Sequence, residues 1–195
     1  MCFIRENPKS RLSSQNCLPR ASFWRNSKPR RGLWLRSNGP KRMPQVFVSS
    51  VVNGPAEQVW AMIRRFDAVA HWLPFVKSSP IENGGDPTRV GCVRVLTQTD
   101  GEVFREILVA LSDAERSYSY TFVSSPVPVR NHRTTLRVLP ITDGDCSYVE
   151  WSSRFEIAPE HESQLVELMN RNFQAGLRSL AEKFRGWSQD ALRSP

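Results

Sequence analysis

The stretch that most constrains the fold is 90–111, which reads VGCVRVLTQTDGEVFREILVAL. Two alternating runs rich in β-branched residues flank an Asp-Gly pair, a pattern typical of a β-hairpin. With a two-residue loop, Arg94 and Glu106 would point to opposite faces of the hairpin. With a three-residue loop at 99–101 and a left-handed Gly101, Arg94 lies directly opposite Glu106 and both side chains share one face. We predict the three-residue loop, and therefore an Arg–Glu pair in one site.

The positive charge of the chain is concentrated at its N-terminus. The first 42 residues hold 11 of the 27 Lys and Arg residues and one of the 19 Asp and Glu residues, a net charge of +10, which leaves −2 for the rest of the chain. A nucleic-acid-binding domain needs a basic face of its own, so we expect no nucleic-acid partner for the folded part. The length of 195 residues suits one domain, which we place at 43–186, followed by a tail at 187–195.

Residues 1–42 are rich in Arg, Ser, Asn and Pro without a hydrophobic period, and we expect this extension to be largely disordered. It lacks the apolar segment of a secretory signal. Three explanations stay open: an over-long gene model before a start at Met43, an organelle transit peptide, or a basic arm that binds RNA or anionic membranes. The expected location is cytoplasmic, or an organelle if the extension is a transit peptide.

The cysteine and histidine residues are not spaced like metal ligands. The four cysteines form no C-x-x-C motif, and the three histidines share no ligand spacing with them. We therefore predict no metal site and no cofactor. No apolar run approaches the ~20 residues that a transmembrane helix needs. The sequence leaves the oligomeric state open.

The hydrophobic pattern predicts a strand, two short helices, six further strands and one long helix. The first helix begins at Pro55, and Asp67 is expected to cap the second. The last helix has one apolar stripe, and Gly176 within it indicates that another group approaches closely there. The predicted strands are 46–52, 76–82, 89–97, 102–111, 117–124, 131–139 and 146–157, and the last helix spans about 160–185.

This order of elements predicts an α+β fold in which a seven-stranded, curved antiparallel sheet wraps around the C-terminal helix. One helix cannot fill the concave side of a strongly bent sheet, so we expect a cavity closed by the short helices and the loops. Under the predicted register, the side chains that face this cavity are mostly aromatic and aliphatic. The opposite face of the hairpin is equally apolar, so hydrophobicity alone does not select the inner face.

Several short segments carry a resemblance to a known family. They are PAEQVWAMIRRFD (55–67), HWLP (71–74), GCVR (91–94), REIL (105–108), RSYSY (116–120), PVRNHRTTLRV (128–138), VEW (149–151) and NFQAGL (172–177). Through them, residues from about 43 to 185 resemble the START/SRPBCC superfamily of polyketide cyclase/dehydrase-like and lipid-transport proteins. The resemblance implies a helix-grip fold. It implies no single activity, because the superfamily contains carriers, receptors and enzymes.

Within this superfamily, the chain is similar to the plant abscisic-acid receptors and to lachrymatory-factor synthase. In the receptors an Arg and a Glu of the hairpin and an Asn of the last helix belong to the polar network of the pocket, and an Arg/Glu pair is also proposed as catalytic in the synthase. The resemblance assigns these roles to Arg94, Glu106 and Asn172, and it places His132 where the family has a pocket tyrosine. The gate loop of the receptors is reduced to residues 99–101, so we do not expect hormone-receptor gating.

The candidate catalytic residues are Arg94 and Glu106, with His132 as a further proton-transfer group. Arg94 offers forked donors to an oxyanion, so we expect a ligand with a carboxylate, a carbonyl or a phenol. A purely structural salt bridge, with His132 as part of the wall, is the alternative. The candidate ligand-binding residues are Trp72, Cys92, Phe104, Leu108, Tyr120, Phe122, His132, Thr134, Trp151, Met169, Asn172 and Phe173.

The sequence therefore predicts a carrier or binding protein for a small hydrophobic molecule, such as a lipid, a polyketide, or an aromatic or carboxylate-bearing metabolite. The alternative is a cofactor-independent cyclase, dehydratase or isomerase that uses Arg94 and Glu106. A third class, a nucleic-acid or membrane-surface protein, would depend on residues 1–42 alone.

Overall fold

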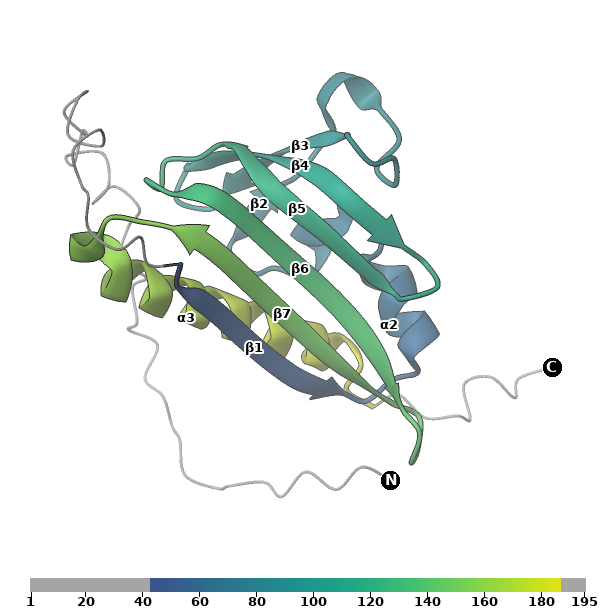
Figure 1. The fold of residues 1–195 in the computed structure, drawn as a ribbon. Helices are drawn as coiled ribbons and strands as arrows, with labels where there is room; N and C mark the ends of the chain where they lie inside the picture. The colour runs from purple at the N-terminus through teal and green to yellow at the C-terminus, as the bar shows by residue number, and fades with distance from the viewer. Residues whose placement is uncertain (1–42, 187–195) are drawn as a thin grey trace.

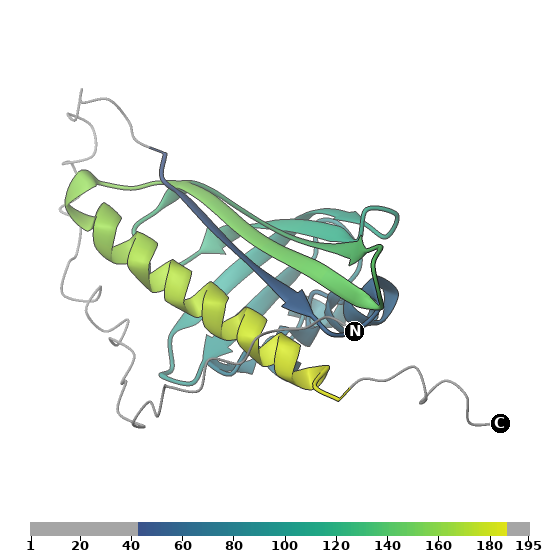
Figure 2. The same cartoon turned by 90° about the horizontal axis from the view of Figure 1, so that it is seen from below.

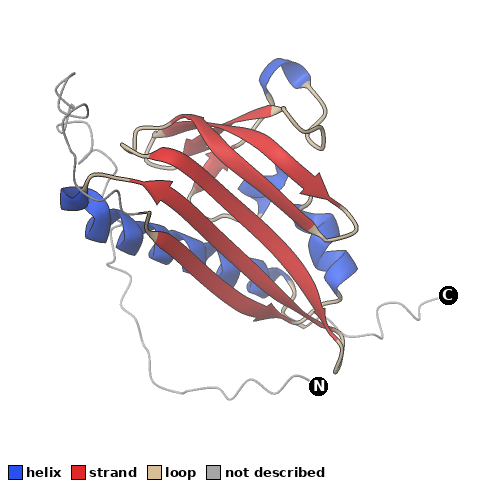
Figure 3. Cartoon of the chain, viewed as in Figure 1, coloured by secondary structure: helices blue, strands red, loops and turns tan. Residues whose placement is uncertain are grey.

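The computed structural model describes residues 43–186, which form a seven-stranded antiparallel sheet and a long C-terminal helix (Figure 3). Across the sheet the order is β1-β7-β6-β5-β4-β3-β2, so β1 joins the sheet beside the last strand (Figure 1). The predicted α+β helix-grip fold is confirmed. The strands are β1 (Gln45–Val52), β2 (Val76–Ser78), β3 (Val93–Gln98), β4 (Val103–Ser112), β5 (Ser117–Ser124), β6 (Arg130–Ile141) and β7 (Cys146–Glu156).

The predictions for residues 1–42 and 187–195 lie outside the described residues. Among the helices of residues 43–186, none is both long enough and apolar enough to cross a membrane.

The long helix α3 (Pro159–Lys183) runs along one face of the curved sheet (Figure 2). Proline occupies its first turn, where the missing N–H leaves no hydrogen bond unmade, and two glutamates nearby favour the positive end of the helix dipole. One stripe of the helix is buried against the sheet, as the sequence predicts. The buried residues of this stripe are Leu165, Phe173, Gly176, Leu177 and Leu180.

Two short helices separate β1 from β2. The first, α2 (Ala56–Ile63), buries one apolar face that includes Val59 and Trp60. The second, η2 (Ala68–His71), is a short 3-10 helix, and the side chain of Asp67 does not cap it. This corrects the predicted cap: the Asp67 carboxylate accepts hydrogen bonds from the Arg65 guanidinium instead, at 2.9 and 3.2 Å.

The strands β2 and β3 are shorter than predicted. After β2, Ser79 donates a hydrogen bond to the carbonyl oxygen of Asp67, and Pro80 has no N–H for strand pairing, so the strand does not continue to residue 82. A 3-10 turn, η3 (Glu82–Gly84), follows there. Before β3, Cys92 N donates to the carbonyl oxygen of Arg89 in a turn, and regular pairing starts only at Val93.

The register of the hairpin is the predicted one. Arg94 of β3 pairs opposite Glu106 of β4. Gln98 N donates to the carbonyl oxygen of Glu102 at 2.8 Å, and Gly101 has a φ of 87°, so the loop is the three-residue type with a left-handed glycine. Both charged side chains therefore point to the concave face of the sheet and are buried.

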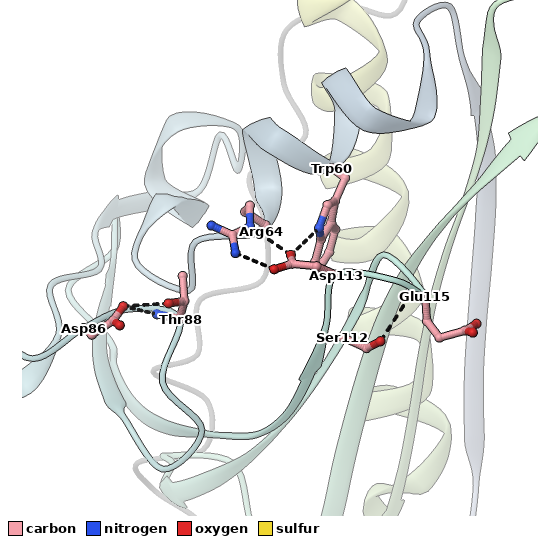
Figure 4. Close-up of polar contacts among 7 residues, drawn as sticks. All are labelled: Trp60, Arg64, Asp86, Thr88, Ser112, Asp113 and Glu115. Carbon is pink, nitrogen blue, oxygen red and sulfur yellow. Dashed lines mark hydrogen bonds and ion pairs between the residues drawn. The ribbon is translucent and has the colours of Figure 1, made fainter.

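A set of polar contacts fastens α2 to the turn between β4 and β5 (Figure 4). The Asp113 carboxylate accepts hydrogen bonds from Trp60 Nε1 at 2.8 Å and from the Arg64 guanidinium at 2.7 and 3.0 Å. These bonds from Arg64 and Trp60 hold the pKa of Asp113 below its ordinary value. Trp60 is almost fully buried, so its indole N–H needs such a partner, and α2 is thereby positioned at one end of the sheet.

Gly176 is the point of closest approach between α3 and the residues beneath it. A Cβ atom at this position would lie 2.5 Å from Leu73 Cδ2 and 2.9 Å from Trp151 Cζ3. Both distances are shorter than a van der Waals contact, so the close approach predicted for this glycine is confirmed. The absence of a side chain lets Leu73 and Trp151 pack directly against the helix backbone.

We predict that Gly176→Ala lowers the free energy of unfolding by about 1 kcal/mol, because overpacking of ~1–3 kcal/mol exceeds the gain of ~1 kcal/mol in helix propensity. Urea unfolding at equilibrium measures this difference. The control is Gln174→Ala on the exposed side of α3, which should change stability by less than ~0.5 kcal/mol. A Gly176→Ala protein more stable than the wild type would contradict the close-packing explanation.

Candidate functional site

A cavity of about 130 Å³ lies between the concave face of the sheet, the first half of α3 and three loops. Aromatic and aliphatic side chains form most of its wall, with a small group of polar side chains among them. The residues predicted for the site that line this cavity are Arg94, Phe104, Glu106, Tyr120, Phe122, His132, Thr134, Trp151, Met169, Asn172 and Phe173.

Three residues predicted to line the cavity lie elsewhere. Trp72 is buried in the solid core, where it packs on Trp151 at a ring distance of 5.5 Å and reaches the space left by Gly176. Leu108 is fully buried in the core cluster. Cys92 lies in the turn before β3, and burial raises the pKa of its thiol, which makes it an unreactive residue at the edge of the core.

The cavity wall also contains residues that were not predicted from the sequence. Leu168 lies on α3, and the others flank prolines, as in the segments 73–75 and 127–129, or lie near the tip of the β3–β4 hairpin. Apolar residues on both sides of a loop proline are the signal that could have pointed to four of them, because burying apolar surface is favourable. The missed residues are Leu73, Phe75, Gln98, Asp100, Val127, Val129 and Leu168.

Arg94 and Glu106 form a buried ion pair in the cavity wall. Arg94 Nε donates to Glu106 Oε2 at 2.6 Å, and the side chains are 2% and 7% exposed. Arg94 Nη1 donates to the carbonyl oxygen of Phe66 at 2.8 Å, which joins the pair to the segment between α2 and η2. Burial disfavours the guanidinium charge, but the field of Glu106 outweighs it and keeps the pKa of Arg94 above its ordinary value.

Aromatic rings surround the Arg94 guanidinium. Its central carbon lies 3.9 Å from the ring centre of Phe66 and 4.8 Å from that of Tyr120, within the range of cation–π attraction. Tyr120 is itself fully buried, and burial raises the pKa of its hydroxyl, so this group stays neutral beside the ion pair. The charge of Arg94 is thus held in place by one carboxylate, one carbonyl oxygen and two rings.

A chain of hydrogen bonds runs from His132 through Thr134 to Ser153. Thr134 Oγ1 lies 2.8 Å from His132 Nε2, and the same hydroxyl donates to Ser153 Oγ at 2.8 Å. The His132 ring stacks on Phe122 at 3.8 Å. Burial lowers the pKa of His132 to about 4. The ring is therefore neutral near pH 7, so a proton-transfer role at that pH would start from the unprotonated imidazole.

Comparison with known proteins supports the fold. Residues 43–185 match the family described as polyketide cyclase/dehydrase and lipid transport. Abscisic acid receptor PYL10 of Oryza sativa subsp. japonica is 29% identical over 107 residues, which cover 50% of each chain. Abscisic acid receptor PYL1 of Arabidopsis thaliana is 29% identical over 90 residues, 45% of this chain and 40% of the receptor. The chain thus spans about half the length of the curated relatives it matches.

Solved structures show the same fold. The protein XoxI of Bacillus cereus is 32% identical with a TM-score of 0.66, and the match covers 73% of this chain and 96% of that one. Norcoclaurine synthase of Thalictrum flavum is 16% identical with a TM-score of 0.62, covering 75% of this chain and 89% of the synthase. At that identity the second likeness concerns the fold alone.

We predict that replacing both partners of the buried ion pair together costs less stability than the sum of the two single substitutions would suggest. Arg94→Met leaves the Glu106 charge buried without its partner and should lower the free energy of unfolding by ~3–5 kcal/mol. The double variant Arg94→Met/Glu106→Gln should be less destabilised than the sum of the single variants, because it leaves no unpaired charge. Urea unfolding of the two single variants and the double variant gives the coupling energy.

The matched control for this cycle is Arg105→Met on the same strand as Glu106. Arg105 points to the other face of the hairpin, where it pairs with Glu82 and is 42% exposed, so its loss should change stability by less than ~1 kcal/mol. If Arg94→Met lowered the free energy of unfolding no more than Arg105→Met does, burial would not explain the cost of breaking the Arg94–Glu106 pair.

We predict that the protein loses stability in acid through His132. The folded state binds a proton only near pH 4, whereas the unfolded chain does so near pH 6.5, so stability falls as the pH drops from 6.5 to 4. The expected loss is about 3 kcal/mol relative to His132→Phe, which keeps the ring stacked on Phe122. Denaturant unfolding at pH 7, 5.5 and 4 measures it, with exposed His71→Gln as the control. Equal acid losses in the wild type and His132→Phe would disprove this linkage.

Proposed function

The chain belongs to the polyketide cyclase/dehydrase and lipid-transport family, and from this premise we propose that it binds a small hydrophobic molecule in its internal cavity, as a carrier or binding protein. One observation carries the proposal: an apolar cavity of about 130 Å³ remains within an otherwise packed core and contains a buried polar group of residues. The comparisons leave the ligand itself open.

Packing supports a ligand for this cavity. Protein interiors are close-packed and hold few voids larger than a water molecule, so a space of about 130 Å³ between the sheet and the helix stands out from the core around it. A concave, mostly apolar wall with a few polar groups is typical of small-molecule sites.

The curated relatives support a binding role. Two of them are named as abscisic acid receptors. The gate loop that the sequence analysis attributes to such receptors is shortened here to residues 99–101, so we assign this chain a binding role and not a hormone-receptor role.

A second candidate function is cofactor-independent catalysis in the same cavity. It is favoured by the position of Glu106, a carboxylate on the cavity wall with one oxygen bound to Arg94. The other oxygen could accept a proton from a bound substrate. Arg94 would then be a positioning residue that holds the carboxylate in place.

We predict that the purified full-length chain carries a small apolar compound that a cavity-filling variant loses. Met169→Trp adds bulk to the cavity wall, whereas Gln174→Trp adds the same indole to the exposed face of the same helix. Native mass spectrometry followed by solvent extraction should find the compound in the wild type and in Gln174→Trp, and not in Met169→Trp.

Retention of the compound in Met169→Trp would contradict binding in this cavity. The same extract separates the two candidate functions. A compound that returns unchanged after incubation with fresh protein supports a carrier. A compound converted by the wild type, but not by Glu106→Gln, supports an enzyme.

A further inference from the structure

Two polar residues of the cavity wall, Glu106 and His132, offer a hydrogen-bond acceptor. Glu106 supplies the first acceptor: its Oε2 receives the hydrogen bond from Arg94, and no hydrogen bond to its Oε1 is formed by any group of residues 43–186. Because this carboxylate belongs to the cavity wall, its remaining oxygen is placed to receive a donor from a bound molecule.

His132 supplies the second acceptor. Thr134 gives its hydroxyl proton to Ser153, so it accepts a proton from His132, which puts the imidazole hydrogen on Nε2. Nδ1 of the neutral ring then carries a lone pair. Nδ1 is buried and has no hydrogen-bond partner among the described residues. A buried acceptor without a partner is unfavourable until a ligand donor reaches it.

The charged donor of the wall is already engaged. Arg94 is bound by Glu106 and by the carbonyl oxygen of Phe66, and its face is packed on aromatic rings. Among the neutral groups of the wall, Trp151 Nε1 can only donate and has no hydrogen-bond partner within residues 43–186, whereas Tyr120 and Asn172 can both donate and accept. A hydroxyl, which can donate and accept, suits this set of groups.

The charges on the wall also disfavour an anion. Within the described residues, the cavity is lined by one cation, Arg94, and by two carboxylates, Glu106 and Asp100. The cation is neutralised by Glu106 at 2.6 Å, so a ligand carboxylate would meet an excess of negative charge in a poorly solvated site.

The volume sets the size of the ligand. An apolar cavity of about 150 Å³ is known to accommodate benzene. The present cavity of about 130 Å³, lined by Phe104, Phe122 and Phe173, therefore suits a molecule of about one ring.

We propose that this cavity selects a ligand of single-ring size that donates a hydrogen bond through a neutral hydroxyl or amine, and that it discriminates against carboxylates. This rests on the proposed binding function, and it narrows the ligand class expected from the sequence, which included carboxylate-bearing metabolites. Glu106 Oε1 and His132 Nδ1 are the acceptors that recognise the donor.

The test uses three probes of similar size: 4-fluorophenol, 4-fluorotoluene and 4-fluorobenzoate. Fluorine NMR titration of the full-length chain, stripped of bound compounds and kept at pH 7, measures their dissociation constants. The phenol should bind about tenfold or more tightly than the toluene, because it adds a hydrogen bond to a charged or buried acceptor. The benzoate should bind more weakly than the toluene, because its charge is desolvated without a free cation.

Variants assign the selectivity to the two acceptors. His132→Phe should reduce the preference for phenol over toluene severalfold. Glu106→Gln should also reduce this preference, and it should strengthen benzoate binding because it removes a negative charge. Glu82→Gln removes a carboxylate from the outer face of the hairpin and should leave all three dissociation constants unchanged.

The outcomes distinguish this inference from the proposed function. Equal binding of phenol and toluene, or tightest binding of benzoate, would overturn the donor selectivity while leaving a functional cavity. A preference for phenol that survives in both His132→Phe and Glu106→Gln would overturn the assignment to these acceptors. No binding of any probe would reject the binding function, and the selectivity with it.

Discussion

The cavity depends on the buried pairing of Arg94 with Glu106. The pair links β3 to β4, and the bond from Arg94 to the carbonyl oxygen of Phe66 adds the segment between the two short helices. Burying two charges is unfavourable unless their hydrogen bonds are well made, so this geometry tolerates little movement of the elements that provide the partners. This charged contact therefore helps to hold the segment between the short helices against the sheet, and it places a carboxylate on the cavity wall.

The cavity exists because α3 approaches the sheet closely at one end only. At Gly176 the helix backbone packs directly on Leu73 and Trp151, and further on Phe184 packs close to Gly54. In the earlier half of the helix, Leu165, Leu168, Met169 and Asn172 line the cavity instead of filling it. The C-terminal half of the helix is thus packed on its neighbours, whereas the earlier half also borders the cavity.

The sequence was sufficient for those features that depend on local rules. The left-handed Gly101 fixes the hairpin loop, the loop fixes the register, and the register brings Arg94 to Glu106. Features that depend on contacts between distant segments were missed or misplaced. Trp72 was expected on the cavity wall, but it packs in the core beside Gly176 and Trp151. No local sequence pattern indicates this contact. Loop residues of the wall are likewise positioned by tertiary packing.

Burial also determines how the site responds to pH. It keeps His132 neutral, and the field of Glu106 keeps Arg94 charged in spite of its burial, so neither group changes its charge between about pH 5 and 8. Tyr120 stays neutral in the same range. These groups therefore present the same pattern of donors and acceptors throughout that interval. Any pH dependence of binding within it should then follow the ionisation of the ligand, since a ligand that loses its donor proton loses the feature that the acceptors recognise.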